Sequence, residues 1–219
     1  MYFASRTAAG KLLAEQVVAR YKGQPCAVIA LSDGSVMVGA QIALKLQSLL
    51  CLLMMQAIEL PREIQPVGGI TEDGSFTYND LYSPSEIEEL VSEYHNYLNE
   101  ERGSRLSGMH RLLGSGGSIR KELLTDKNII LVSDGLSSGF SLDMAAEFLK
   151  TVKYKRLVVA TPLASVPAVD RMHVLADEIF CLTVVEDYIN TDHYYDARDD
   201  VPPHDKIVKV MEEIMQHWK

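Results

Sequence analysis

The sequence predicts an α/β fold: a doubly wound, mainly parallel sheet flanked by helices, with a small hood or lid. Short apolar runs alternate along nearly the whole chain with stretches whose apolar residues recur at helical spacing. Two of these runs end in small polar residues that lead directly into such a helical stretch. A segment rich in Gly, Ser and Arg interrupts the alternation and is the candidate lid.

The predicted strands share continuous Val, Ile, Leu or Ala content, which is typical of strands buried on both faces of a parallel sheet. They are residues 26–31, 49–58, 129–132, 156–161 (ending at Pro162) and 177–183. The predicted helices share apolar residues at i, i+3, i+4 and i+7 or a clear start signal. They are residues 8–21, 36–46, 83–102, 142–149, 166–175 and a closing helix near 208–215.

Three further segments lie between these elements. Residues 67–77 predict an edge hairpin with its turn at Asp73-Gly74. We expect Glu72 and Asp73 in a solvated turn there, with a position facing a ligand site as the alternative. Residues 103–117 are interpreted either as a mobile lid or as a solvated linker. The nearby basic residues are Arg102, Arg105, Arg111, Arg120 and Lys121.

Composition limits the functional class. The 219 residues suggest a single domain, residues 1–219. A formal net charge of −9 argues against a nucleic-acid surface, which needs a basic footprint. No apolar run reaches the roughly 18 residues that span a bilayer, and the first residues lack the apolar region of a signal peptide. Cys26, Cys51 and Cys181 are scattered and odd in number, so we expect reduced thiols in a cytoplasmic protein.

The stretch 128–149 carries the most specific signal. Its strand is followed by Ser133 and Asp134, and a helix begins near residue 142. The loop between them offers two glycines and three serines: Gly135, Leu136, Ser137, Ser138, Gly139 and Ser141. Loop N–H groups, serine hydroxyls and the positive end of a helix together favour an anion, so we predict a phosphate site here.

Two alternatives remain for this loop. Residues 135–139 also match G-x-S-x-G, the nucleophile elbow of α/β-hydrolases, with Ser137 as nucleophile. Its triad partners would come from the pairs His193 with Asp192, or His173 with Asp170 or Asp177. The other alternative is a plain strand-to-helix turn rich in small residues. That turn explains the glycines but not an aspartate at the strand tip followed by three serines.

A second loop follows the same local pattern. The run 26–31 ends in Ser32, Asp33, Gly34 and Ser35, and a helix follows. Both polar loops therefore leave the carboxyl ends of predicted parallel strands, where ligands bind in folds of this class.

The stretch 128–149 resembles the phosphoribosyl-diphosphate loop of type I phosphoribosyltransferases: an apolar strand, two acidic residues, a Gly/Thr-rich turn and a helix. This resemblance implies a phosphoribosyltransferase-like fold that binds phosphoribosyl diphosphate or a nucleotide 5′-phosphate. Asp134 and Ser133 take the places of the two catalytic acids that hold the ribose hydroxyls, and residues 135–141 wrap the 5′-phosphate. Residues 32–35 take the place of the pyrophosphate loop. An active enzyme would release Mg²⁺-bound pyrophosphate, and we expect a homodimer.

Two departures separate the chain from this pattern. Ser133 stands where the family has its first acid, and Asp33 stands where a basic residue is common. These favour a second hypothesis, a catalytically degenerate binding or regulatory module of the same fold. A serine hydrolase using Ser137 is the third. Residues 67–77 resemble a strand pair of predicted phosphoribosyltransferases of unspecified substrate. The acidic and aromatic residues 186–205 resemble a segment that the family has near its site, which implies a role in holding a divalent cation or a base. A solvated face is the favoured interpretation.

Overall fold

The computed structural model of the protein describes residues 2–113 and 118–216. The chain forms two compact units. The first comprises Met1–Leu52, Arg120–Leu142 and Val152–Lys219, and the second comprises Leu53–Ile119 and Asp143–Thr151. In the described part of the chain, no helix is both long and apolar enough to cross a membrane.

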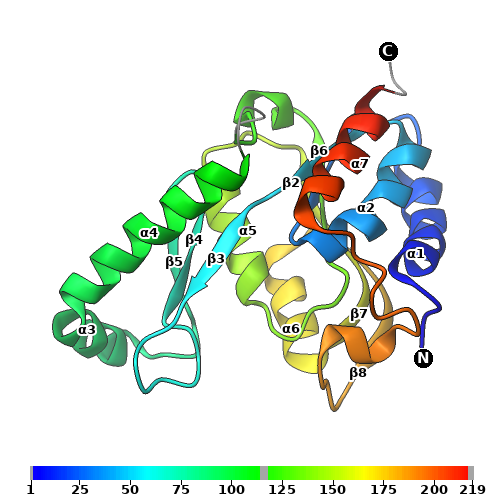
Figure 1. The fold of residues 1–219 in the computed structure, drawn as a ribbon. Coiled ribbons are helices and arrows are strands. Elements are labelled where there is room, and N and C mark those ends of the chain that lie inside the picture. Colours follow the sequence, from blue (N-terminus) through cyan, green and yellow to red (C-terminus); the bar gives the residue numbers. More distant parts are fainter. Residues whose placement is uncertain (1, 114–117, 217–219) are drawn as a thin grey trace. The chain divides into compact units, whose positions relative to one another are not determined.

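A five-stranded parallel sheet forms the centre of the first unit, with strand order β2-β1-β6-β7-β8 (Figure 1). Its strands are β1 (Cys26–Ala30), β2 (Leu49–Leu52), β6 (Asn128–Val132), β7 (Arg156–Ser165) and β8 (Glu178–Val185). Every residue of β1 and β6 is buried, as their continuous apolar runs predict for central strands. The predicted mainly parallel α/β fold is confirmed.

The strand order reverses between β1 and β6. From β1 the chain continues to β2 on one side, whereas β6, β7 and β8 follow on the other side. Ala30 pairs with Val132 in register, so β1 and β6 end at the same level. In open α/β sheets, ligands bind outside the carboxyl ends of the strands at such a reversal. The two polar loops therefore begin where the fold places a ligand site.

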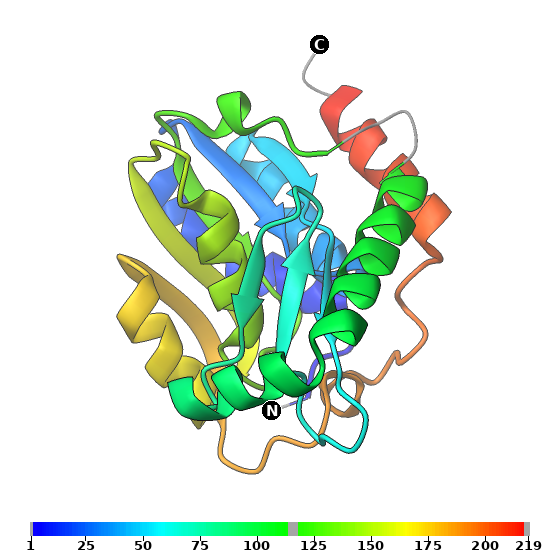
Figure 2. The same ribbon diagram turned by 90° about the vertical axis from the view of Figure 1, so that its left-hand side faces the viewer.

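Helices α1 (Arg6–Tyr21) and α2 (Asp33–Leu46) pack against each other beside this sheet (Figures 1 and 2). A Cβ atom at Gly10 would lie 2.8 Å from the Val38 carbonyl oxygen, so the close approach of the two helices requires glycine there. The other helical elements are α5 (Phe140–Leu149), α6 (Val166–Leu175), α7 (His204–Gln216) and the short 3₁₀ helices η2 (Lys121–Leu124) and η3 (Thr191–Tyr194).

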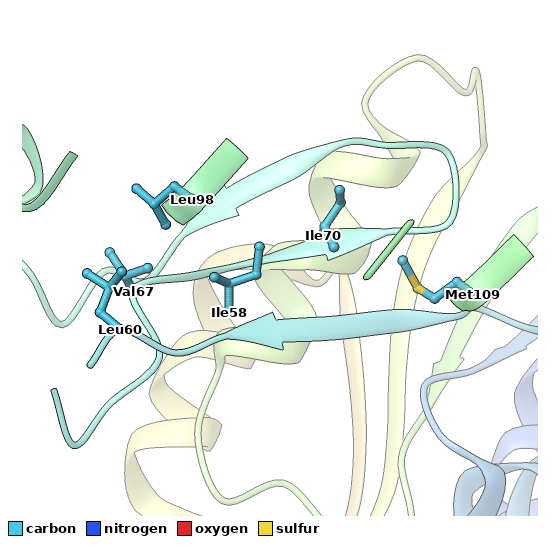
Figure 3. Close-up of a cluster of buried hydrophobic side chains, with 6 residues drawn as sticks. All are labelled: Ile58, Leu60, Val67, Ile70, Leu98 and Met109. Atoms are coloured by element: carbon cyan, nitrogen blue, oxygen red, sulfur yellow. The ribbon is translucent and has the colours of Figure 1, made fainter. Parts of the chain in front are cut away.

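The second unit contains a three-stranded antiparallel sheet of β3 (Met55–Ile58), β4 (Gly68–Thr71) and β5 (Phe76–Tyr78), in that order. Helices α3 (Pro84–Glu93) and α4 (His95–Leu113) complete it. Its buried core, drawn in Figure 3, consists of Ile58, Leu60, Val67, Ile70, Leu98 and Met109. The candidate lid, residues 103–117, covers only part of this unit, and its role as a hood or lid stays a prediction.

Several boundaries differ from the sequence-based expectation. The apolar run 49–58 is not one strand: it divides into β2 and β3, which belong to different sheets. Residues 83–102 are divided between α3 and α4, and residues 103–113 continue α4 rather than forming an irregular segment. Residues 114–117 of the candidate lid lie outside the described residues. Strand β7 continues past Pro162 to Ser165.

The predicted hairpin at residues 67–77 is confirmed, but the expected solvated position of Glu72 is wrong. Glu72 is completely buried, and its carboxylate accepts hydrogen bonds from the backbone N–H groups of Met54 (3.0 Å) and Ile119 (2.6 Å). His110 Nε2 lies 2.8 Å from its carbonyl oxygen. Burial raises the pKa of Glu72. This glutamate therefore holds three segments of the second unit together.

Candidate functional site

The two polar loops meet at Asp134. The hydroxyls of Ser32 and Ser35 each lie 3.0 Å from Asp134 Oδ1 and 2.6 Å from each other, and the Asp134 backbone N–H donates to Ser35 Oγ at 3.1 Å. A Cβ atom at Gly34 would lie 2.3 Å from Asp134 Oδ2, so this contact requires a glycine at that position. Asp33, Gly34 and Ser35 form the first turn of α2 rather than a separate loop, with Ser32 as its N-cap.

Arg6 lies at the centre of this arrangement, although no motif in the sequence marks it. Its side chain is only 3% exposed, and its guanidinium pairs with three carboxylates. Nε donates to Asp134 Oδ2 at 2.8 Å, Nη1 donates to Asp200 Oδ1 at 2.6 Å, and Nη2 donates to Asp192. Burial alone would lower the pKa of Arg6, but hydrogen bonds to these aspartates outweigh it and raise the pKa above its usual value.

The acidic and aromatic segment 186–205 is not simply a solvated face. It supplies Asp192 and Asp200, which pair with Arg6. It also contributes Tyr195, whose hydroxyl donates to the Asp134 carbonyl oxygen at 2.5 Å. The Arg6 guanidinium carbon lies 4.6 Å from the centroid of the Tyr195 ring. A Cβ atom at Gly135 would lie 2.6 Å from the Tyr188 hydroxyl. Burial raises the pKa of Tyr188 to about 12, so this hydroxyl stays protonated at neutral pH.

The inner part of the loop after β6 is closed upon itself. Ser133 is buried, its hydroxyl donates to the Gly135 carbonyl oxygen at 3.0 Å, and it accepts the Gly135 N–H at 3.2 Å. Both Ser133 and Asp134, the positions that the family resemblance assigns to the ribose hydroxyls, therefore have partners within the protein.

The outer part of the loop is held by its backbone and leaves two serines open. Leu136 exchanges hydrogen bonds with the end of β7: its N–H donates to Leu163, and its carbonyl oxygen accepts from Ser165. The Ser165 hydroxyl also donates to the Ser137 carbonyl oxygen at 2.8 Å. The side chains of Ser137 and Ser138 are exposed, directly before α5 begins.

The remaining residues of the two predicted loops have contacts of their own. Ser141 lies in the first turn of α5 and is half-buried. Gly139 packs against the aliphatic part of Arg171 in α6, since a Cβ atom at Gly139 would lie 2.2 Å from Arg171 Cγ. Asp33 faces a histidine: His204 Nδ1 lies 2.9 Å and 3.2 Å from its two carboxylate oxygens.

The structure does not assemble a serine-hydrolase triad around Ser137. Asp192 binds Arg6, and His193 Nε2 instead lies 2.9 Å from the Tyr2 hydroxyl. Across residues 2–113 and 118–216, no histidine is hydrogen-bonded to the Ser137 side chain.

Together, the parallel sheet and its two polar loops define a phosphoribosyltransferase-type domain. The chain belongs to this family, because the family model described as a phosphoribosyl transferase domain matches residues 4–199. The resemblance of the stretch 128–149 to this family is thus confirmed at the level of the whole domain.

The relatives agree with this assignment. A Mycobacterium tuberculosis protein, provisionally named a phosphoribosyl transferase in strains CDC 1551 / Oshkosh and H37Rv, is 26% identical over 189 residues. The match covers 82% of this chain and 40% of that protein, so the chain spans less than half the length of the curated relatives it matches. The crystal structure of TT1426 from Thermus thermophilus is similar with a TM-score of 0.70 and 24% identity, over 100% of this chain and 99% of that one. This likeness supports the fold.

Proposed function

We propose that this domain binds a phosphorylated ribose, as phosphoribosyl diphosphate or a nucleotide 5′-phosphate, with the phosphate at residues 135–141. The observation that carries the proposal is the loop after β6, where Ser137 and Ser138 are exposed directly before the N-terminus of α5. Free N–H groups and the positive end of a helix favour a phosphate at such a place. Family membership and the strand-order reversal beside the loop support the same ligand class.

We favour binding or regulation over fast phosphoribosyl transfer. Ser133 stands where the family resemblance places an acidic residue, and Asp33 stands where it places a basic residue. The Asp134 carboxylate is also paired with Arg6. Mg²⁺ usually keeps several waters and is held by one or two carboxylates together with substrate phosphates. Mg²⁺ is therefore proposed only as an ion carried by the phosphates of the ligand.

Calorimetry with ribose 5-phosphate tests the binding proposal. We expect Ser137→Ala to weaken binding by about 1 kcal/mol, the net value of one hydrogen bond. Ser107→Ala, which removes an exposed hydroxyl from α4, is the matched control and should leave affinity unchanged. Wild-type protein that binds no ribose phosphate would contradict the proposal.

A turnover assay separates the alternatives. With phosphoribosyl diphosphate, Mg²⁺ and a panel of nucleobases, we expect no rapid release of pyrophosphate. Brisk release would show an active transferase. Stoichiometric labelling of Ser137 by a fluorophosphonate would instead favour the hydrolase.

We further propose that the protein is a cytoplasmic homodimer. The acidic composition and the three scattered cysteines are the features that support a cytoplasmic location. Light scattering should give twice the mass of one chain. A monomer at micromolar concentration would contradict the dimer, and recovery in a secreted or membrane fraction would contradict the location.

A further inference from the structure

We propose that the protein forms its homodimer through strand β8, whose open edge pairs in the antiparallel sense with β8 of a second copy. This inference rests on the proposed function, which includes the homodimer, and adds the surface that forms it. The elements involved, β7, β8 and α1, all belong to the first unit.

Strand β8 lies at one edge of the five-stranded sheet (Figure 1). It pairs with β7 on one side, and within residues 2–113 and 118–216 no strand pairs with its other side. An edge strand presents a row of N–H and C=O groups that is a template for pairing with another chain. With eight residues, β8 is longer than the usual strand of about 5–6 residues. It therefore offers a long backbone edge to a partner.

The side chains of β8 are mostly apolar, yet none of them is fully buried. The strand is half-buried throughout except at Val184, which is 52% exposed. In the neighbouring strand β7, by contrast, every residue after Arg156 is buried. The chain itself covers only part of β8, where Leu182 and Val185 pack against the cluster around Phe3. Covering the apolar surface that remains would be favourable, because it removes this surface from water.

The sequence of β8 does not protect its edge. Natural edge strands prevent pairing with lysine, with proline or by a very short length. The only charged residue of β8 is Glu178, at its first position, and the strand contains no lysine, arginine or proline. The strand at the other edge of the sheet, β2, is four residues long, and α7 packs against it. Of the two edges, β8 is therefore the one that lacks protection.

The amino end of β8 is surrounded by basic side chains. Three exposed basic residues lie there: Arg20, Lys155 and Arg156. The two acids at this end already have partners within the chain. Asp177 accepts a backbone N–H of β7 at 2.8 Å, and Glu178 lies 3.4 Å from Arg20. Basic charge therefore predominates at the beginning of the strand.

The carboxyl end of β8 is acidic, since Glu186 and Asp187 follow the strand directly and are exposed. Antiparallel pairing places the carboxyl end of each strand beside the amino end of the other. The acids of each copy then lie beside the basic residues of the other copy, and a twofold axis repeats this contact. Parallel pairing would instead bring the acids of both copies together. Because opposite charges fix the register of an interface, this complementarity favours a second copy as the occupant of the edge.

Sedimentation equilibrium of two matched valine variants tests the interface. A lysine on an edge strand opposes pairing, and the twofold axis brings it into the interface twice, so Val184→Lys should raise the dimer dissociation constant by at least about tenfold. Val208→Lys changes an exposed valine of α7 instead and is the control, which should leave the dissociation constant unchanged.

The outcomes separate this inference from the proposed function. A wild-type dimer that Val184→Lys leaves intact would overturn the β8 interface while the homodimer stands. Dissociation by Val208→Lys alone would likewise overturn it, because α7 covers the other edge. A wild type that is monomeric at micromolar concentration would overturn both the interface and the homodimer, and binding of ribose 5-phosphate is measured separately.

Hydrogen exchange of the wild-type chain gives a second measurement that needs no variant. Every second backbone N–H of β8 points away from β7, and these groups are hydrogen-bonded only when another strand supplies the acceptors. We expect them to exchange more slowly in a concentrated, dimeric sample than in a dilute one. Equal exchange rates in a dimeric and a dilute monomeric sample would overturn the inference, even if Val184→Lys failed to fold.

Discussion

Replacing Arg6 by alanine should destabilise the first unit strongly. The substitution leaves the Asp134 and Asp200 side chains, 11% and 14% exposed, without their cation. Breaking a buried ion pair by removing one partner costs about 3–5 kcal/mol. The third partner, Asp192, is 62% exposed and adds little, because water screens such pairs. Urea unfolding followed by circular dichroism should therefore show a loss of about 3–5 kcal/mol.

The chain offers matched controls for this prediction. Arg20 is 62% exposed and lies 3.4 Å from Glu178, so Arg20→Ala should cost less than about 1 kcal/mol. Asp200→Ala should cost more than Asp192→Ala, since the Asp200 side chain is 14% exposed and that of Asp192 is 62% exposed. An Arg6→Ala variant as stable as Arg20→Ala would refute the reasoning that the buried guanidinium organises the site.

Other predictions concern single features of the two units. Burial raises the pKa of Glu72. The stability that its protonated form contributes is therefore full below the ordinary carboxyl pKa and is lost as pH rises through the raised value. An NMR titration midpoint at or below that of exposed glutamates would contradict this. Gly103→Ala should stabilise α4 by about 0.5–1 kcal/mol, since a Cβ atom there meets nothing within 4 Å. Gly34→Ala should instead destabilise the protein by about 1–3 kcal/mol, because the new Cβ clashes with Asp134. Unfolding curves in which Gly103→Ala and Gly34→Ala change the free energy of unfolding in the same direction would be inconsistent with this packing. Burial also raises the pKa of Cys26, so a thiol reagent at about pH 8 should modify it only after unfolding; rapid reaction in the native state would argue against this.

Local patterns in the sequence were sufficient to predict the parallel sheet and the polar residues that follow β1 and β6, although residues 33–35 belong to the first turn of α2. Continuous apolar runs identify buried strands, and helical spacing identifies the elements between them. The helix at residues 166–175 was predicted with its observed bounds, since Pro167 provides a clear start signal. The run 49–58 was harder, because it is apolar throughout. The break falls where Met54 exchanges hydrogen bonds with Glu72, a contact across 18 residues.

Arg6 could not be identified in this way, because its partners lie 128, 186 and 194 residues further along the chain. One local signal was available. An arginine in the first turn of a helix opposes the helix dipole, and α1 has no acidic residue in that turn. A cation at this place needs carboxylates from elsewhere, and the acidic segment 186–205 was the obvious supply. Runs of charged residues are commonly solvated, however. Composition alone therefore favoured a solvent-exposed Asp200, whereas its side chain is 14% exposed and pairs with Arg6.

The most direct test of the central claim is a crystal structure of the chain soaked with ribose 5-phosphate. We predict phosphate oxygens within hydrogen-bonding distance of the N–H and hydroxyl groups of residues 137–141, with the pair between Arg6 and Asp134 intact. A phosphate bound elsewhere, or no bound phosphate at a saturating concentration of ribose 5-phosphate, would contradict the account.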